Sequence, residues 1–167
     1  MFDREYVFYG KHAKMIEKLK ANLSDEIGRG FFETTYDIYQ VAPVIGWIYK
    51  RRSQIDKTGE TTKIFPEKMM KGKNDLVFNY RNMMAVHFGD RPTEEIMNIA
   101  FKMDYNDEAR KEYDEIYNSY VLGGLEEMYE QIFLRDNAST VDEYIQNMYE
   151  FLEELNMRLY GVTFEEE

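Results

Sequence analysis

The sequence contains no cysteine and only three prolines, one tryptophan and two histidines among 167 residues. Without cysteine neither a disulfide framework nor a thiolate metal site can form, and a reducing compartment is the simpler setting. The two imidazoles, His12 and His87, lie in no Gly-x-Ser-x-Gly or comparable setting, so a nucleophilic triad has few candidate bases. We therefore expect a cytoplasmic protein that is not an enzyme and has no catalytic residues.

Long apolar runs are missing as well. The most apolar window, residues 41–49, contains Pro43 and Gly46 and is far shorter than the roughly 20 residues of a membrane-spanning helix. The chain has neither a phosphate-cradling Gly-x-x-x-x-Gly-Lys motif nor a dinucleotide-binding fingerprint. Its glutamates lack the Glu-x-x-His spacing of di-iron bundles. We expect no membrane partner, no cofactor and no metal site.

What is present indicates a folded helical protein. Hydrophobic residues make up 44% and aromatic residues 16% of the chain, too much apolar surface for a disordered polymer despite a net charge of −11. The periodicity is helical nearly throughout, and we predict an all-α fold, a compact single-domain bundle of about six helices. This domain spans residues 1–167, with 161–167 as a frayed acidic tail.

The predicted helices follow from apolar spacing and end signals. Residues 51–62 are expected to form a loop, Thr93 to cap a short helix, and Thr140 to Glu143 to form a capping box. Gly123 and Gly124 should interrupt the longest helix. The helices are expected at residues 3–23, 33–50, 73–88, 107–134 and from 140 onward, with a further helix entry at residues 65–67 and the short helix after Thr93.

Charge is distributed unevenly along the chain. Residues 104–167 contain 18 acidic and 4 basic residues, whereas residues 50–73 contain 8 basic and 3 acidic residues. The basic segment is the only part expected to contact nucleic acid, since phosphate contacts require local positive charge; its cations can equally stabilise a helix C-terminus. The candidate contacts for phosphate or an acidic partner are Lys50, Arg51, Arg52 and Lys57. The residues interpreted as a solvated acidic face are Glu126, Glu130, Glu150, Glu153 and Glu154.

The paired glycines form a second candidate site. Two glycines in a helix cost about 2 kcal/mol relative to alanine, so they should have a reason: a close helix crossing, a kink, a break, or contact with a partner. The residues proposed for contact with a partner helix are Tyr120, Gly123, Gly124 and Glu127.

Two segments resemble a known family. The run Phe32-Glu33-Thr34 leads into an apolar helix that ends Gly46-Trp47-Ile48-Tyr49-Lys50-Arg51-Arg52, and a later run reads Tyr117-x-x-Tyr120-x-x-Gly123-Gly124-Leu125-Glu126. Together they resemble the small accessory proteins of bacterial DNA phosphorothioation-dependent restriction loci. The resemblance implies a non-enzymatic component of an anti-phage defence system, working beside a larger ATPase or nuclease. It carries over no catalytic residue.

Three functions stay open at this point. The first is an accessory or adaptor subunit of such a defence system, which binds a larger protein partner. The second is an acidic DNA-mimic inhibitor, a phage-encoded protein whose carboxylates imitate DNA phosphates and block a restriction or CRISPR enzyme. The third is an enzyme with a carboxylate metal site. A homodimer is compatible with each of them.

Overall fold

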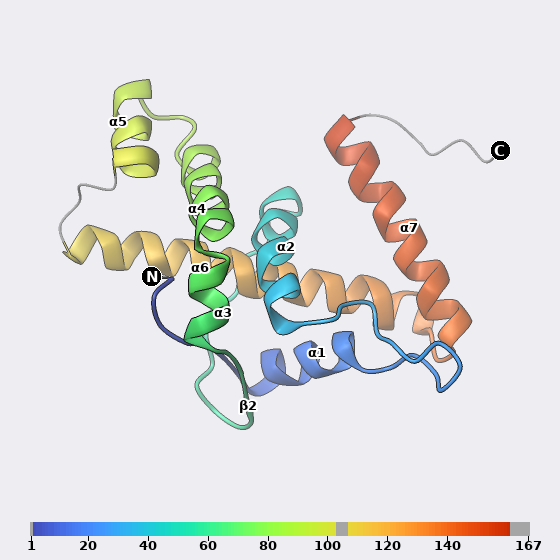
Figure 1. Ribbon diagram of the computed structural model, residues 1–167. Helices are drawn as coiled ribbons and strands as arrows, with labels where there is room; N and C mark the ends of the chain where they lie inside the picture. The colour runs from blue at the N-terminus through green and yellow to red at the C-terminus, as the bar shows by residue number, and fades with distance from the viewer. Residues whose placement is uncertain (1, 103–106, 161–167) are drawn as a thin grey trace.

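The computed structural model describes residues 2–102 and 107–160, and these ranges are mostly α-helical (Figure 1). The all-α prediction is confirmed, with one small sheet added to the helices. The tail expected at residues 161–167 lies outside the described residues. In chain order the elements are β1 (Tyr6–Tyr9), α1 (Gly10–Lys20), α2 (Thr35–Ile48), β2 (Thr61–Ile64), α3 (Pro66–Lys71), α4 (Lys73–His87), α5 (Thr93–Met97), the π-helix η1 (Asn98–Lys102), α6 (Asp107–Tyr129), the π-helix η2 (Glu130–Leu134), the 3₁₀-helix η3 (Arg135–Asn137) and α7 (Val141–Tyr160).

The sheet corrects two predictions, a helix from residue 3 and an unbroken loop over 51–62. Strands β1 and β2 pair antiparallel, with Tyr6 opposite Ile64 and Tyr9 opposite Thr61. The β1 sequence consists of three aromatic residues and a valine, which favour strands. Gly10 then begins α1 with a φ of +52°, a conformation that glycine adopts without steric cost. The helical periodicity of residues 3–9 gave a wrong prediction, because the strand that pairs with them lies more than fifty residues away in the chain.

Helices α2 and α6 cross closely at the centre of the molecule (Figure 1). A Cβ atom added at Gly124 would overlap the carbonyl oxygen of Ala42, and one added at Gly46 would overlap that of Tyr120. Helix α6 continues through Gly123 and Gly124, so the predicted interruption is wrong. The close crossing accounts for the paired glycines, because only residues without a side chain let two helix backbones meet at this separation.

The helix ends follow their local signals, with one exception. Thr34 caps α2 in a capping box with Asp37, and the Thr140 and Glu143 backbone amides bond each other's side chains at 2.8 and 3.3 Å. The expected cap at Thr93 is wrong, because Pro92 is the N-cap and Thr93 already lies in the first turn of α5. Proline's fixed φ suits a position at a helix start.

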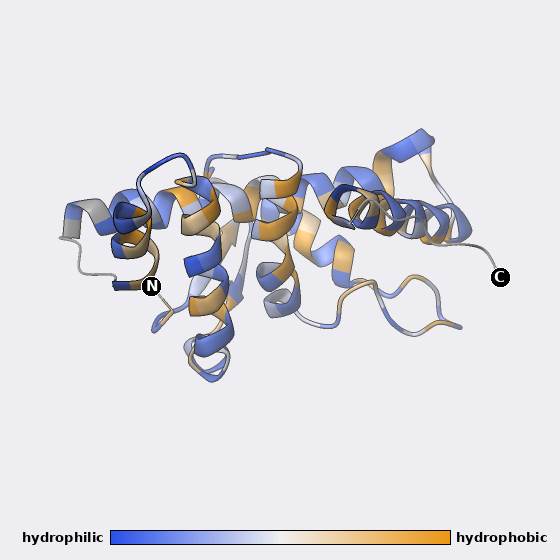
Figure 2. Ribbon diagram, turned by 90° about the horizontal axis from the view of Figure 1, so that it is seen from above, coloured by the Kyte–Doolittle hydropathy of each residue, from blue (hydrophilic) through white to orange (hydrophobic). Residues whose placement is uncertain are grey.

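The core is rich in aromatic rings. In Figure 2 hydrophobic positions gather on the helices at the centre of the molecule. The rings of Tyr39 and Tyr117 are fully buried and lie 6.2 Å apart, and Phe2 packs edge-on against both Tyr80 and Tyr117. Such edge-to-face pairs are favourable beyond the area that they bury. Among the helices of the described ranges, none combines the length and apolar character needed to cross a membrane.

Candidate functional site

Arg51 lies at the centre of the most extensive charge network in the structure. Helix α2 ends at Ile48, and Lys50, with a φ of 52°, turns the chain back so that Arg51 meets α6. Its Nη1 atom donates to Glu127 at 3.0 Å and to Glu130 at 2.6 Å, and Nη2 donates to Glu126 at 3.2 Å and to Glu130 at 2.6 Å. The two-pronged contact with Glu130 is the bidentate geometry that makes arginine–carboxylate pairs strong.

Glu126 is the buried member of this network, with 8% of its side chain exposed. Besides Arg51, it contacts Lys11 Nζ at 2.7 Å, His12 Nε2 at 2.8 Å and Ser53 Oγ at 2.6 Å. Burial disfavours the carboxylate, but the hydrogen bonds from Lys11, Ser53 and His12 outweigh it and lower the pKa of Glu126 to about 2. Burial also lowers the pKa of His12, against the opposing effect of Glu126.

This network corrects one member of the predicted solvated acidic face, Glu126. Glu126 is buried and Glu130 is bound to Arg51. Arg135 of η3 lies 3.4 Å from Glu150 and 3.9 Å from Glu154 of α7. Glu153, the remaining member of the predicted face, accepts a hydrogen bond from Tyr149 at 3.1 Å. The error arose because helical spacing places acids on a surface but cannot show which distant cations the fold brings to them.

The predicted phosphate contacts also lie in different surroundings. Arg51 points into the carboxylate network, so it is not available to a phosphate. Arg52 donates from Nε to Ser119 Oγ at 2.7 Å, and its guanidinium lies 5.4 Å from the centre of the Tyr120 ring. Lys50 and Lys57 are exposed. These four candidate cations therefore do not form one patch.

The predicted partner-helix contact is internal to the chain. Gly123 and Gly124 are buried, and a Cβ atom at Gly123 would overlap the carbonyl group of Arg51. Tyr120 is buried and its hydroxyl lies 2.9 Å from His87 Nδ1, while Glu127 is bound to Arg51. These positions bring α6 against α2 and the segment after it, and they present no surface to another protein.

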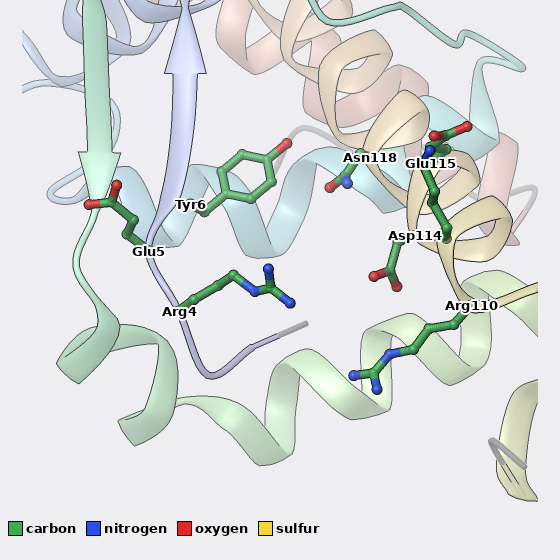
Figure 3. Close-up of a pocket in the computed structure, with 8 residues that line it drawn as sticks. Arg4, Glu5, Tyr6, Arg110, Asp114, Glu115 and Asn118 are labelled. Atoms are coloured by element: carbon green, nitrogen blue, oxygen red, sulfur yellow. The ribbon is translucent and has the colours of Figure 1, made fainter. Parts of the chain in front are cut away.

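A polar cavity of about 440 Å³ lies between the start of the chain and α6. Figure 3 shows Arg4 and Tyr6 extending from one side toward Arg110, Asp114 and Asn118 on α6. Burial raises the pKa of Asp114, and no described group donates to the buried Oδ1 atom of Asn118. This cavity could not be predicted from the sequence, because its two walls are about a hundred residues apart in the chain. The full lining is Arg4, Glu5, Tyr6, Arg110, Lys111, Asp114, Glu115 and Asn118.

Helix α7 leaves much of its apolar face uncovered. Only Asn147 and Phe151 are buried along its length, whereas Ile145, Leu152 and Leu159 are 43%, 46% and 48% exposed. These three residues are spaced by seven, which is two helical turns, so they lie in one row along the helix. Exposed large apolar side chains that line up in this way are typical of protein interaction surfaces.

The exposed face of α2 lies on the same side of the molecule. Val44 and Trp47 are 38% and 39% exposed, although α2 is otherwise the central buried helix. A cavity of about 400 Å³ is lined by residues of both helices, among them Trp47 and Ile48 of α2 and Arg158 and Leu159 of α7. Figure 1 shows α7 at one end of the molecule and α2 nearer its centre.

Together these features define a mostly helical, acidic protein with an internal arginine–carboxylate network and an exposed apolar helix face. Among the described residues, no group of three His, Cys, Asp or Glu side chains is placed to hold a metal ion. A family model for DNA sulphur modification system-associated protein 4 matches residues 10–156, and the chain belongs to this family. The resemblance to accessory proteins of DNA phosphorothioation loci is thereby confirmed. No curated protein and no solved structure matches the chain.

Proposed function

We propose that the protein is a non-enzymatic, cytoplasmic adaptor that binds a larger ATPase or nuclease of a DNA sulphur modification system. Its membership of a family associated with such systems supports a role beside other proteins. The observation that carries the proposal is the uncovered apolar row of α7, formed by Ile145, Leu152 and Leu159. An apolar face of this length is costly to leave in water unless a partner covers it.

The spacing along α7 indicates a helix as the partner element. Its apolar residues alternate in steps of four and three, which is the heptad pattern of a coiled-coil seam. Phe151 turns toward the body, where its ring lies 5.9 Å from that of Tyr49, while the row of α7 stays open. An amphipathic helix of the partner can therefore seat on this row. The heptad residues are Val141, Ile145, Met148, Leu152, Leu155 and Leu159.

Charge indicates the chemistry of that partner helix. Helix α7 contains five acidic residues and one arginine, Arg158. A second copy of the chain would bring two acidic helices together, which like-charge repulsion opposes. A partner helix with basic flanks would be attracted instead. We therefore assign the row to another protein with a basic amphipathic helix, not to a homodimer.

The DNA-mimic alternative has less support. A mimic needs rows of unpaired carboxylates, but Glu126, Glu127 and Glu130 are bound by Arg51. Arg135 and Arg158 lie against further carboxylates of α7. The acidity of the C-terminal half is thus partly neutralised within the chain.

The test is complex formation with the other proteins of the same DNA sulphur modification system. The chain is co-expressed with each of them, and the complex is quantified after purification. Leu152→Glu places a charge in the apolar row and should weaken binding by about tenfold or more, since burying an unpaired charge is costly. Met157→Glu is the matched control, because Met157 is 50% exposed and lies on the opposite side of α7. It should leave binding unchanged.

Two results would overturn the proposal. Equal binding by wild type and Leu152→Glu would remove α7 from the interface, and failure of every protein of the system to bind would remove the adaptor function. ATP hydrolysis or DNA cleavage by the purified chain alone would contradict its non-enzymatic character.

A further inference from the structure

A third cavity, of about 770 Å³, lies where the segment after α2 meets the end of α4 and the middle of α6. Its volume falls in the range of small-molecule sites, roughly 300–1,000 Å³. It shares Tyr6, Glu115 and Asn118 with the cavity of Figure 3, so the two are neighbours along α6. The residues that give it chemical character are Arg52, His87, Arg91, Glu112 and Glu115.

Two arginines are held in this cavity by aromatic rings. The Arg52 guanidinium lies 5.4 Å from the Tyr120 ring centre, and that of Arg91 lies 4.3 Å from the Phe88 ring centre. His87 stands between the two rings, 5.7 Å from Tyr120 and 4.7 Å from Phe88. The two guanidinium groups and the three rings thus form one continuous row, in the order Arg52, Tyr120, His87, Phe88 and Arg91. Stacking on rings immobilises the guanidinium planes before any ligand arrives.

Arg52 and Arg91 keep N–H donors available to a ligand. Arg52 uses Nε to bond Ser119 and forms no ion pair with the described residues. Arg91 bonds Glu95 through Nη1. Since a guanidinium has five N–H donors, both arginines can still donate. His87 contacts the Tyr120 hydroxyl through Nδ1, and when that hydroxyl donates, the ring proton resides on Nε2 and becomes a further donor.

The electrostatics of His87 reflect the positive charge of the two arginines near it. Burial is the largest effect that lowers the pKa of His87, and Arg52 and Arg91 lower it further, against a smaller opposing effect of Asp90. A bound anion would offset both arginines and raise this pKa. Glu112 and Glu115 are exposed residues on the α6 wall, where they would oppose a long polyanion.

We propose that this cavity binds the phosphate group of a mononucleotide, held between Arg52, Arg91 and His87. The carboxylates Glu112 and Glu115 are acceptors for sugar hydroxyls or base amino groups. The apolar side chains that can contact the base are Ile55, Ile116 and Leu122. A duplex is a poorer ligand, because a chain of net charge −11 repels an extended polyanion. This site is independent of the α7 surface.

The test is titration of the full chain with three probes, AMP, inorganic phosphate and a short DNA duplex. Affinity is measured by calorimetry and the two histidine side chains are followed by NMR. AMP should shift the ring signals of His87 but not those of His12, raise the pKa of His87, and bind more tightly than phosphate or duplex. The groups that face His87 in this titration are Arg52, Arg91, Asp90, Tyr120, Glu112 and Glu115.

Two variants locate the ligand, and a third is the control. Arg52→Gln and Arg91→Gln should each weaken AMP binding by about tenfold or more, since each removes charge-assisted hydrogen bonds. Lys57→Gln removes a cation of the same basic segment outside the cavity and should bind AMP like wild type. Equal loss in all three variants, AMP binding no tighter than phosphate, tighter binding of the duplex, or an unshifted His87 would each overturn the proposal. Circular dichroism of each variant shows that it is folded.

Discussion

Arg51 joins three parts of the chain that are far apart in sequence. Through Glu126 it connects the segment after α2 with Lys11 and His12 of α1, and through Glu127 and Glu130 it reaches the end of α6 and the start of η2. A buried charge is stable only while its partners are present. The network is therefore sensitive to the loss of its single arginine.

Replacing Arg51 should destabilise the protein strongly. Arg51→Met leaves Glu126 and Glu127 buried with fewer cations, and breaking a buried pair in this way costs about 3–5 kcal/mol of unfolding free energy. Urea denaturation measures the change. Lys57→Met, at an exposed loop position, should stay within about 0.5 kcal/mol of wild type. A loss at Arg51 no larger than this control would show that the network does not stabilise the fold.

Glu126 should make the unfolding free energy depend on pH. Its pKa falls from an ordinary 4.5 to about 2 in the folded chain. The folded state therefore binds the proton less readily than the unfolded state, so the stabilisation is fully present above pH 4.5 and is lost as pH falls toward about 2. Glu126→Gln should flatten the unfolding free energy over this range. Glu94→Gln, on the exposed first turn of α5, should keep the wild-type profile; identical profiles for the two variants would contradict the assignment.

At the scale of elements, the crossing of α2 and α6 organises the core. The crossing depends on Gly46 and Gly124, which place each backbone against the other helix. Gly124→Ala would drive a Cβ atom into the Ala42 carbonyl, and neither helix can yield without moving core residues. We expect a loss of about 3 kcal/mol or more in unfolding free energy, the upper range for overpacking.

The control for that substitution is Gly89→Ala. Atoms near a Cβ at Gly89 lie at 3.4 Å or more, so this variant should unfold close to wild type. Thermal unfolding of both proteins tests the comparison. Equal melting temperatures would mean that α2 and α6 can separate at little cost.

Helix α7 differs from α6 in how it is held. Asn147 donates to the carbonyl oxygens of Ile132 and Arg135 at 3.2 and 3.1 Å, which anchors its first half. Its last turns are held through Arg158, which lies over the Tyr49 ring. We predict that amides of residues 155–160 exchange hydrogen faster than those of α6, because few buried contacts oppose local opening. Slower or equal exchange, measured by mass spectrometry, would show that α7 is a fixed part of the body.

For the molecule as a whole, net charge opposes self-association, whereas exposed apolar surface favours it. The chain has a net charge of −11 and a mass of 20.1 kDa, and the α7 row is its most regular exposed apolar feature. Repulsion between acidic copies acts over about 30 Å at 0.01 M salt and about 3 Å at 1 M. We expect a 20.1 kDa monomer at low salt and self-association through α7 at high salt.

Light scattering coupled to size exclusion measures this equilibrium. Leu152→Glu should stay monomeric at both salt concentrations, and Met157→Glu should behave like wild type. A stable dimer of wild type at low salt would make a second copy, instead of another protein, the occupant of the α7 row.

Several features of the fold were predictable from local sequence. The Thr34 and Thr140 caps are set by residues three positions away, and the apolar spacing of residues 73–88 gives a helix almost at those limits. The family was predictable too, because the glycine pair and the basic end of α2 lie in short runs. The candidate site was not predictable, since the sequence indicated a cation available to phosphate at Arg51 and a solvated carboxylate at Glu126.

The helical class, most helix ends and the family could thus be predicted from the sequence, because each depends on residues within a few positions of one another. Three features could be seen only in the folded chain: residues 6–9 form a strand, Gly124 meets Ala42, and Arg51 is bound by three carboxylates. Each of these depends on groups brought together from distant parts of the chain. Burial then changes what such a group does, because a charge that water would stabilise on the surface must find its partner inside the protein.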